Sequence, residues 1–197
     1  MFDKFILKHG FTKDPKKLYE YIVKGLTIGP FFQVIVTDDD YIECVKESAG
    51  ILISLRKITK ENIDEVLALK VDEDQRSFVS CNGDSLAQAY VYPETAFPFA
   101  VYEDSTVVGF IMMGYYEAKK YYTLWKFMID SRYQNKGYGR KALELGIQYL
   151  RERFDISEIY TGVIPGNIKA KKLYESIGFK GTGLVESGME EMRLILT

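Results

Sequence analysis

The sequence contains a single histidine, His9, and only two cysteines, Cys44 and Cys81, which lie far apart along the chain. A zinc site built from histidine and cysteine, a histidine-based catalytic triad and a disulfide framework are therefore all disfavoured. We expect reduced, buried thiols and no bound metal. If the protein is an enzyme that moves a proton, the acceptor has to be a carboxylate or a water relay, unless it is His9.

The chain also lacks a long apolar run and a strong net charge. Its longest apolar stretch, residues 107–116, is about half as long as a bilayer-spanning helix and is interrupted by glycines. The first ten residues mix charged and apolar side chains, unlike a signal peptide. With 26 basic and 28 acidic residues the net charge is -2, which indicates neither a membrane nor a nucleic acid as partner. We expect a cytoplasmic protein.

What is present is the composition of a globular protein, with 47% hydrophobic and 27% charged residues among 197. The sequence divides into two parts. Residues 1–50 predict a small N-terminal α/β extension, with a helix over 15–24, a strand over 31–37 and a second helix from about 38 to 48. No motif identifies its role, so an interface (for example in a homodimer), a contribution to the functional pocket and a passive extension all stay open.

Residues 51–197 predict one longer domain in which strands and helices alternate. The strands are expected at 51–58, 98–104, 106–117, 122–130, 158–164, 179–185 and 189–196. The helices are expected at 59–70, 85–90, from 139 onwards and at 167–177. Consecutive strands in the middle favour antiparallel pairing. The predicted fold class is therefore α/β, with a mixed, mostly antiparallel central sheet and helices on both faces.

The first informative segment is RYQNKGYGRK, residues 132–141, between a strand and the long helix. Gly137 and Gly139 allow a tight turn whose N–H groups point outward, and the helix N-terminus adds partial positive charge. Basic side chains are interspersed and no acidic residue is present, although the whole chain is slightly acidic. This pattern predicts a phosphate site, with a glycine-containing loop carrying solvated charges as the alternative.

The same residues match the dinucleotide pattern G-x-G-x-x-G/A, so a nicotinamide or flavin site has to be considered. In that fingerprint the glycine turn follows the strand directly, whereas here the strand ends near Asp130. The segment also follows antiparallel strands, and Asp155 precedes the next strand instead of ending it. These three features disfavour a dinucleotide site.

The second segment, residues 163–179, contains a helix with clear boundaries. Asn167 is a good N-cap and Gly178 a good C-terminal glycine. Asn167, Ala170 and Tyr174 are spaced so that they share one helix face, where the small alanine allows close approach of another molecule. On this helix alone, the favoured interpretation of Tyr174 is a core tyrosine with a bonded hydroxyl.

Together the two segments resemble the GNAT superfamily of N-acetyltransferases. The loop Q/R-x-x-G-x-G/A, which binds the pyrophosphate of coenzyme A in that family, is present as residues 134–139. The helix pattern N-x-x-A-x-x-L-Y followed by G-F is present from Asn167 to Phe179. The order of elements agrees as well, over roughly three quarters of the chain. Residues 74–79 and 85–90 resemble the bacterial branch often assigned as spermidine/spermine or diamine acetyltransferases.

This resemblance implies a direct transfer of the acetyl group from acetyl-CoA to a primary amine. Tyr174 would protonate the departing thiolate, and strand amides would stabilise the oxyanion. Lys169, Lys171 and Lys172 would be candidates for the 3′-phosphate. The coenzyme-binding residues that the resemblance implies are Phe127, Met128, Ile129, Gln134, Asn135, Lys136, Gly137, Tyr138, Gly139, Arg140, Asn167 and Lys172.

The acceptor side is less well specified by the sequence. Animal spermidine/spermine enzymes carry two carboxylates before the Phe-x-Val of the coenzyme strand, whereas this chain has Trp125 and Lys126 there. The remaining acidic candidates are Asp72, Glu73, Asp74, Asp84, Glu94 and Glu117. We favour Glu94 and Glu117 as catalytic groups, with a water chain as an equal option.

The acceptor itself is expected to be a small molecule, with spermidine or spermine as the leading examples. An amine of a protein, a peptide or an amino acid is an alternative. A module that binds acetyl-CoA without catalysis also stays open. A nucleic-acid binder that uses the basic helix starts near 137 and 167 is disfavoured, because it would need a broader basic face.

Overall fold

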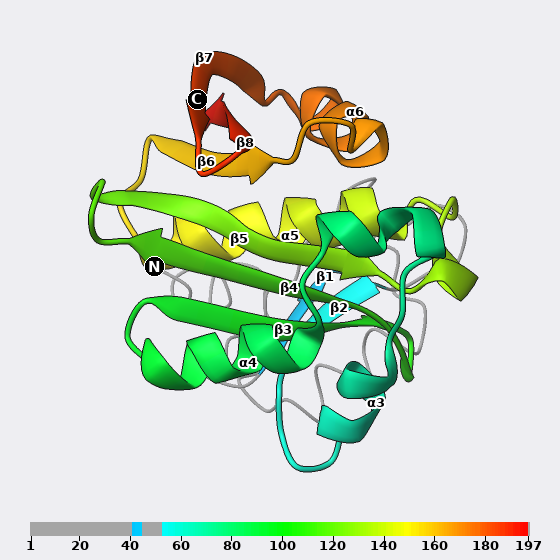
Figure 1. Ribbon diagram of the computed structural model, residues 1–197. Helices are drawn as coiled ribbons and strands as arrows, with labels where there is room; N and C mark the ends of the chain where they lie inside the picture. Colours follow the sequence, from blue (N-terminus) through cyan, green and yellow to red (C-terminus); the bar gives the residue numbers. More distant parts are fainter. Residues whose placement is uncertain (1–40, 45–52, 197) are drawn as a thin grey trace, which may run out of the picture.

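The structure is a computed structural model that describes residues 41–44 and 53–196, and the account of the fold is confined to them. Within these ranges, eight strands form one sheet in the order β1-β2-β3-β4-β5-β6-β8-β7 (Figure 1). The strands are β1 Tyr41–Cys44, β2 Ile53–Lys57, β3 Ala96–Glu103, β4 Thr106–Tyr116, β5 Tyr121–Ile129, β6 Glu158–Val163, β7 Lys180–Glu186 and β8 Met189–Ile195.

Helices cover both faces of this sheet. They are α3 Ile63–Ala68, α4 Asn82–Val91, α5 Tyr138–Arg153 and α6 Ile168–Ile177, with short 3-10 turns η1 Glu73–Phe78 and η2 Ser131–Tyr133. The long helix α5 lies behind the central strands in Figure 1, while α3 and α4 lie in front of them. Each face has its own hydrophobic cluster. One gathers the apolar side of α5 with Tyr174 of α6, and the other gathers Val66, Leu69 and Ala89 with the opposite side of β3 and β4.

Strand β4 lies at the centre of both clusters. Residues 107–114 are all buried, which explains why this segment reads as a continuous apolar run without alternation. Every neighbouring pair in the sheet is antiparallel except β5 and β6. These two are parallel, and only two residue pairs join them, Thr123 with Tyr160 and Leu124 with Thr161. Beyond Leu124 and Thr161 the two strands part.

The predicted fold class is confirmed: the sheet is mixed, mostly antiparallel and covered on both faces. One N-terminal prediction is wrong, because residues 41–44 form strand β1 instead of continuing a helix to 48. Their backbone pairs with β2 from Tyr41 opposite Arg56 to Cys44 opposite Ile53. The predicted helix at 15–24 and strand at 31–37 lie outside the described residues. The division of the chain at residue 50 stays a prediction.

Cys81 also differs from expectation, because its thiol is exposed and not buried. It occupies the N-cap position of α4, and its sulfur accepts a hydrogen bond from the N–H of Asp84 at 3.4 Å. The side chain of Cys44 lies outside the description. None of the helices within 53–196 has the length and apolar character of a bilayer-crossing segment.

The packing of β4 against β5 predicts that Gly109→Ala destabilises the protein. A Cβ atom at residue 109 would lie 2.6 Å from the carbonyl oxygen of Met128, a backbone atom that cannot move away cheaply. We expect a loss of about 2 kcal/mol in the free energy of unfolding, measured by urea denaturation. The control is Gly181→Ala, whose Cβ would meet nothing within 4 Å. Equal stability of the two variants would contradict this account of the sheet.

Candidate active site

The parting of β5 from β6 opens a cavity of about 420 Å³. One wall is the second half of β5 with Phe127, and the other is the end of β6 with Val163. Residues 77–80 close one side, and Asn167 and Tyr174 of the α6 region line another. A β-bulge at Trp125 lies where the strands part, since Leu124 pairs with Met113 and Lys126 with Met112. Bulges bend and twist a strand, which is consistent with β5 turning away from β6 at this position.

Beyond the bulge, β5 presents a free backbone edge to this cavity. The N–H of Asp130 donates to the carbonyl of Val108 in β4 at 2.9 Å. Because ladder partners alternate along a strand, the N–H groups of Ile129 and Phe127 point to the opposite edge, which β6 has left. Gln134 confirms the direction, since its side-chain amide donates to the carbonyl of Ile129 at 3.0 Å. The side chain of Met128 packs in the hydrophobic cluster that contains Val66 and Ala89, on the face of the sheet that α3 and α4 cover.

The loop that follows is held in shape by its own backbone. Gln134 donates a second hydrogen bond, to the side-chain oxygen of Gln75 at 2.8 Å, and so ties the loop to η1. Asn135 has φ 62° and Gly137 φ 81°, both in the left-handed region, where glycine carries no steric cost. Gly137 is the N-cap of α5. The first N–H groups of α5 have no acceptor within the helix, so this turn offers several donors in one place.

Tyr138 and Gly139, in the first turn of α5, leave the backbone N–H groups of this turn uncovered, because the first has a buried side chain and the second has none. The side chain of Tyr138 is buried and donates a hydrogen bond to the Glu103 carboxylate. Burial, and after it the contact with Glu103, raises the pKa of Tyr138 to about 12. A Cβ at Gly139 would lie 3.5 Å from Leu173 and 3.7 Å from Phe127, ordinary contact distances. A side chain no larger than that of alanine therefore fits between α5, α6 and β5.

The cations around the loop differ in what they contact. Arg140 donates to the backbone and hydroxyl oxygens of Ser176 at 3.0 and 2.8 Å and pairs with Glu144 at 3.1 Å. Its guanidinium therefore joins α5 to α6. The Lys136 ammonium lies 5.4 Å from the ring centre of Tyr133 and is exposed. Lys136 is thus the more accessible positive charge beside the loop amides.

Asp130, which sequence reasoning did not select, fixes the start of this loop. Its carboxylate is 2% exposed and accepts from Arg132 at 2.8 and 3.1 Å and from the N–H of Lys70 at 2.9 Å. Burial works to raise the pKa of Asp130, but these donors outweigh burial and hold that pKa below its ordinary value. The residue was recognisable only as the last one of a predicted strand, because its partner Lys70 is 60 positions away.

Helix α6 presents its predicted face to the cavity. Asn167 caps the helix, accepting from the N–H of Ala170 at 3.2 Å, and also lines the cavity. Tyr174 is buried, and burial raises its pKa to about 12, partly opposed by a hydrogen bond with Thr161. Thr161 in turn donates to the carbonyl of Leu124 at 3.2 Å, at the last paired position of β5 and β6. The phenol of Tyr174 therefore lies close to the point where β5 and β6 part.

Of the three lysines of α6, two are engaged. Lys171 pairs with Glu190 at 2.6 Å, and Lys169 lies 4.0 Å from Asp74. Lys172 is exposed and makes no ion pair with another described residue. Lys172 is therefore the most accessible of them for a second phosphate group.

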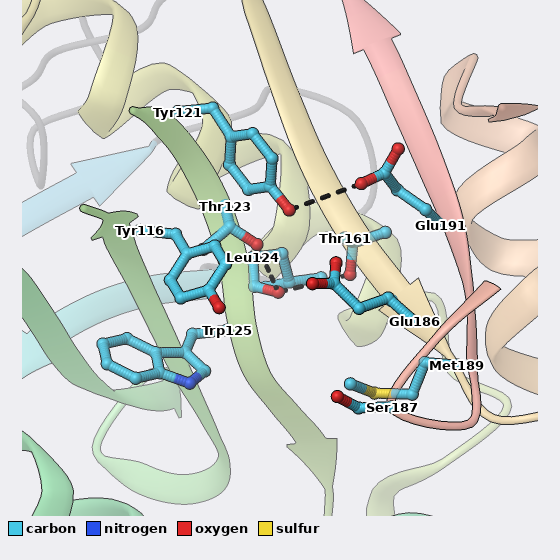
Figure 2. A pocket seen from close by; sticks show the side chains of 11 residues that line it. Tyr116, Tyr121, Thr123, Leu124, Trp125, Thr161, Glu186, Ser187, Met189 and Glu191 are labelled. Atoms are coloured by element: carbon cyan, nitrogen blue, oxygen red, sulfur yellow. Dashed lines mark hydrogen bonds between the residues drawn. The ribbon is translucent and has the colours of Figure 1, made fainter. Parts of the chain in front are cut away.

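A second cavity, of about 200 Å³, adjoins the first and shares Leu124, Trp125 and Thr161 with it. Figure 2 shows Tyr116, Tyr121 and Trp125 on one side of it and Glu186 and Glu191 on the other. The two acids come from the β7–β8 hairpin. The side chain of Glu191 is 9% exposed and that of Glu186 is 50% exposed.

The charges at this second cavity are tied together by Lys119, from the turn between β4 and β5. Its ammonium contacts the carboxylate of Glu186 and lies 3.3 Å from that of Glu191. The hydrogen bond to Glu186 is the main cause that raises the pKa of Lys119 above its usual range. Tyr121 donates to Glu191 at 3.4 Å, and Thr182 donates to it at 3.0 Å.

The acids favoured from the sequence do not line either cavity. Glu94 is exposed in the turn before β3, and Glu117 is exposed in the turn after β4. Asp72, Glu73, Asp74 and Asp84 are likewise exposed. Glu186 and Glu191 were missed because nothing in their local sequence shows that β8 pairs with β6 while β7 lies outside it. Within the described ranges, no three histidine, cysteine or acidic residues are grouped to hold a metal ion.

Comparison with known proteins assigns this architecture to a class. Residues 63–179 match the acetyltransferase (GNAT) family. A spermine/spermidine N(1)-acetyltransferase of Bacillus subtilis strain 168 is 32% identical over 149 residues, which cover 71% of this chain and 95% of that protein. The chain belongs to the GNAT family.

Two further comparisons bear on the fold and on the range of relatives. The structure of a spermidine N-acetyltransferase from Vibrio cholerae, in complex with CoA and spermine, has a TM-score of 0.60 at 19% identity and covers 73% of this chain and 95% of that one. The human N-acetylaspartate synthetase is 29% identical over 102 residues, 50% of this chain and 32% of that protein. The protein is an acetyl-CoA-dependent N-acetyltransferase.

The environment of Asp130 generates a prediction on stability. In Asp130→Ala the N–H of Lys70 loses its acceptor, and Arg132 loses two guanidinium bonds and one backbone N–H bond. We therefore expect a loss of about 2 kcal/mol in the free energy of unfolding at pH 7. Because the folded pKa is depressed, this contribution is complete above the ordinary carboxyl range and is lost as the pH falls through the folded value. Denaturation at pH 7 and near pH 3 measures it. A difference between variant and wild type that stays constant with pH contradicts the ionised pair.

Proposed function

We propose that the protein transfers the acetyl group of acetyl-CoA to a primary amine of a small polyamine such as spermidine or spermine. The observation that carries this proposal is the pair of adjoining cavities at the parting of β5 and β6. One has free amides and a phenol, and the other has carboxylates and aromatic rings. The similarity to the spermine/spermidine enzyme of Bacillus subtilis supports the choice of acceptor.

On the donor side, the residues present fit coenzyme A. The free N–H groups of the α5 turn and the left-handed backbone at Gly137 suit the pyrophosphate, with Lys136 beside them. Lys172 suits the 3′-phosphate. The open edge of β5 at Phe127 and Ile129 suits the amide-containing pantetheine arm, which pairs as an additional strand would. Asn167 lines the same cavity, with its side-chain oxygen already used in the cap.

In the reaction, the neutral amine nitrogen attacks the thioester carbonyl carbon, and the carbon–sulfur bond then breaks. The thiolate that leaves takes a proton, and Tyr174 is the group positioned to give it. The attacking nitrogen loses one proton as the amide forms, and this proton restores the phenol. A pKa of about 12 keeps the phenol protonated throughout the physiological range, so it is always available as a donor. The charge on the carbonyl oxygen is stabilised by N–H groups of the free β5 edge.

On the acceptor side, the amine has to lose a proton before attack, because a primary amine is largely charged at neutral pH. Glu94 and Glu117 do not line either cavity, so a water chain is the group proposed to receive this proton. Glu191 and Glu186 line the second cavity, where they suit a charged nitrogen of the acceptor. The aromatic rings of Tyr116, Tyr121 and Trp125 favour an alkylammonium chain, whose methylenes and charge both bind well to ring faces.

Tyr174→Phe tests the role of the phenol. We expect kcat to fall by about 10²-fold, because the leaving thiolate loses its proton donor, while the KM for acetyl-CoA stays within twofold. Steady-state kinetics with free-thiol detection measure both. Glu175→Gln is the control, because Glu175 is exposed on the same helix and does not line the cavity. Wild-type turnover in Tyr174→Phe would show that the proton comes from elsewhere.

A panel of acceptors with acetyl-CoA tests the substrate class. We expect spermidine and spermine to be acetylated with kcat/KM at least tenfold above that for free amino acids or peptide N-termini, since the second cavity carries carboxylates. Acetylation of aspartate or peptides but not of polyamines would overturn the proposed acceptor. Tight binding of acetyl-CoA with no turnover on any amine would favour a non-catalytic module.

A further inference from the structure

The two carboxylates that line the acidic cavity next to the transfer site are already paired with a cation of the protein itself. The ammonium of Lys119 lies between Glu186 and Glu191, the two carboxylates of the cavity lining. Two carboxylates and one ammonium leave a single net negative charge. Lys119 and the two acids are far apart in the sequence, since Lys119 comes from the β4–β5 turn and the acids come from the β7–β8 hairpin.

The ion pair between Lys119 and Glu186 is partly exposed to solvent and can open. The Lys119 side chain is 31% exposed and that of Glu186 is 50% exposed, so both ends reach water. Lys119 stands in a four-residue turn, followed by Lys120 in the left-handed region. Ion pairs with this degree of exposure contribute little to stability, and another cation can replace one partner at low cost.

The surroundings of this ammonium are those that an alkylammonium group would need. The Lys119 nitrogen lies 5.8 Å from the ring centre of Tyr121, and Tyr121 donates to Glu191. Glu191 is nearly buried and receives a further bond from Thr182, so its position is fixed whether or not Lys119 is present. The site therefore keeps one nearly buried carboxylate, one exposed carboxylate and an aromatic wall when the lysine leaves.

We propose that the ammonium of Lys119 occupies the position that a second ammonium group of the acceptor takes, and that the acceptor binds by displacing it. Lys119 thus sets the preference of the enzyme among amines. An acceptor with a second positive charge can replace the lysine between Glu186 and Glu191, whereas a monoamine of the same length cannot. This inference rests on the proposed function and names the groups that select its acceptor.

The test compares putrescine with butylamine, two amines with the same four-carbon chain that differ in the second ammonium. In Lys119→Met the competing ammonium is lost, while an unbranched side chain shorter by one atom is kept. We expect the KM for putrescine to fall about fivefold, with kcat and the KM for acetyl-CoA unchanged and no change for butylamine. Lys120→Met is the matched control, because Lys120 is in the same turn and makes no ion pair with another described residue.

A second variant separates displacement from a general effect of charge. Lys119→Arg keeps the charge but binds carboxylates with a two-pronged guanidinium, so a displaced group should become harder to displace. We expect the KM for putrescine to rise about threefold. If Lys119→Arg equals the wild type, the lysine acts through charge alone and displacement is wrong. If Lys119→Met raises the KM for putrescine, the lysine helps to bind the acceptor and the proposal is also wrong.

Calorimetry of spermidine binding without acetyl-CoA gives a readout that does not depend on turnover. Lys119→Met should tighten the Kd about fivefold, and Glu186→Gln should weaken it by a similar factor. If the wild type acetylates no amine, the proposed function fails. If the wild type acetylates polyamines, but Lys119→Met has the same Kd and KM as the wild type, the proposed function stands and only this inference is wrong.

Discussion

The structure depends on the short parallel pairing of β5 with β6. Two residue pairs hold the strands together, and the hydroxyl of Thr161 adds a bond to the carbonyl of Leu124 at the last of them. Past this point the backbone of β5 keeps polar groups that have no strand partner. Polar backbone groups away from water need partners, so a split sheet is stable only with a loop, solvent or a ligand at its edge. Gln134 supplies one such partner, at the carbonyl of Ile129.

The same constraint brings the chemistry together. Asp130 follows the last residue of β5 and fixes the loop that leads into α5. The free strand edge and the free helix amides are therefore joined by one short, fixed segment. Helix α6 starts just after β6 has parted, and it brings Asn167 and Tyr174 to the apex from the other side. The proposed reaction places its charges on amides, carboxylates and a phenol, and it uses neither a histidine nor a metal ion.

The sequence predicted most of this domain, and the reasons are local. The apolar run of β4 and the caps of α6 each follow from nearby residues, and the strand and helix bounds between 53 and 196 agree within a few positions. The acceptor side was not predictable in the same way. Glu186 and Glu191 reach the cavity only because β8 inserts between β6 and β7, and Lys119 meets them across about 70 positions. Such long-range contacts depend on the order of the strands in the sheet, which no local sequence pattern encodes.

The central claim is that the open edge of β5 and the first turn of α5 hold coenzyme A through backbone amides. Hydrogen–deuterium exchange with and without coenzyme A tests it directly. The account predicts that binding slows exchange in segments 126–130 and 134–141, and leaves β7, on the outer edge of the sheet, unchanged. Binding that slows exchange elsewhere while both of these segments exchange as before would contradict it.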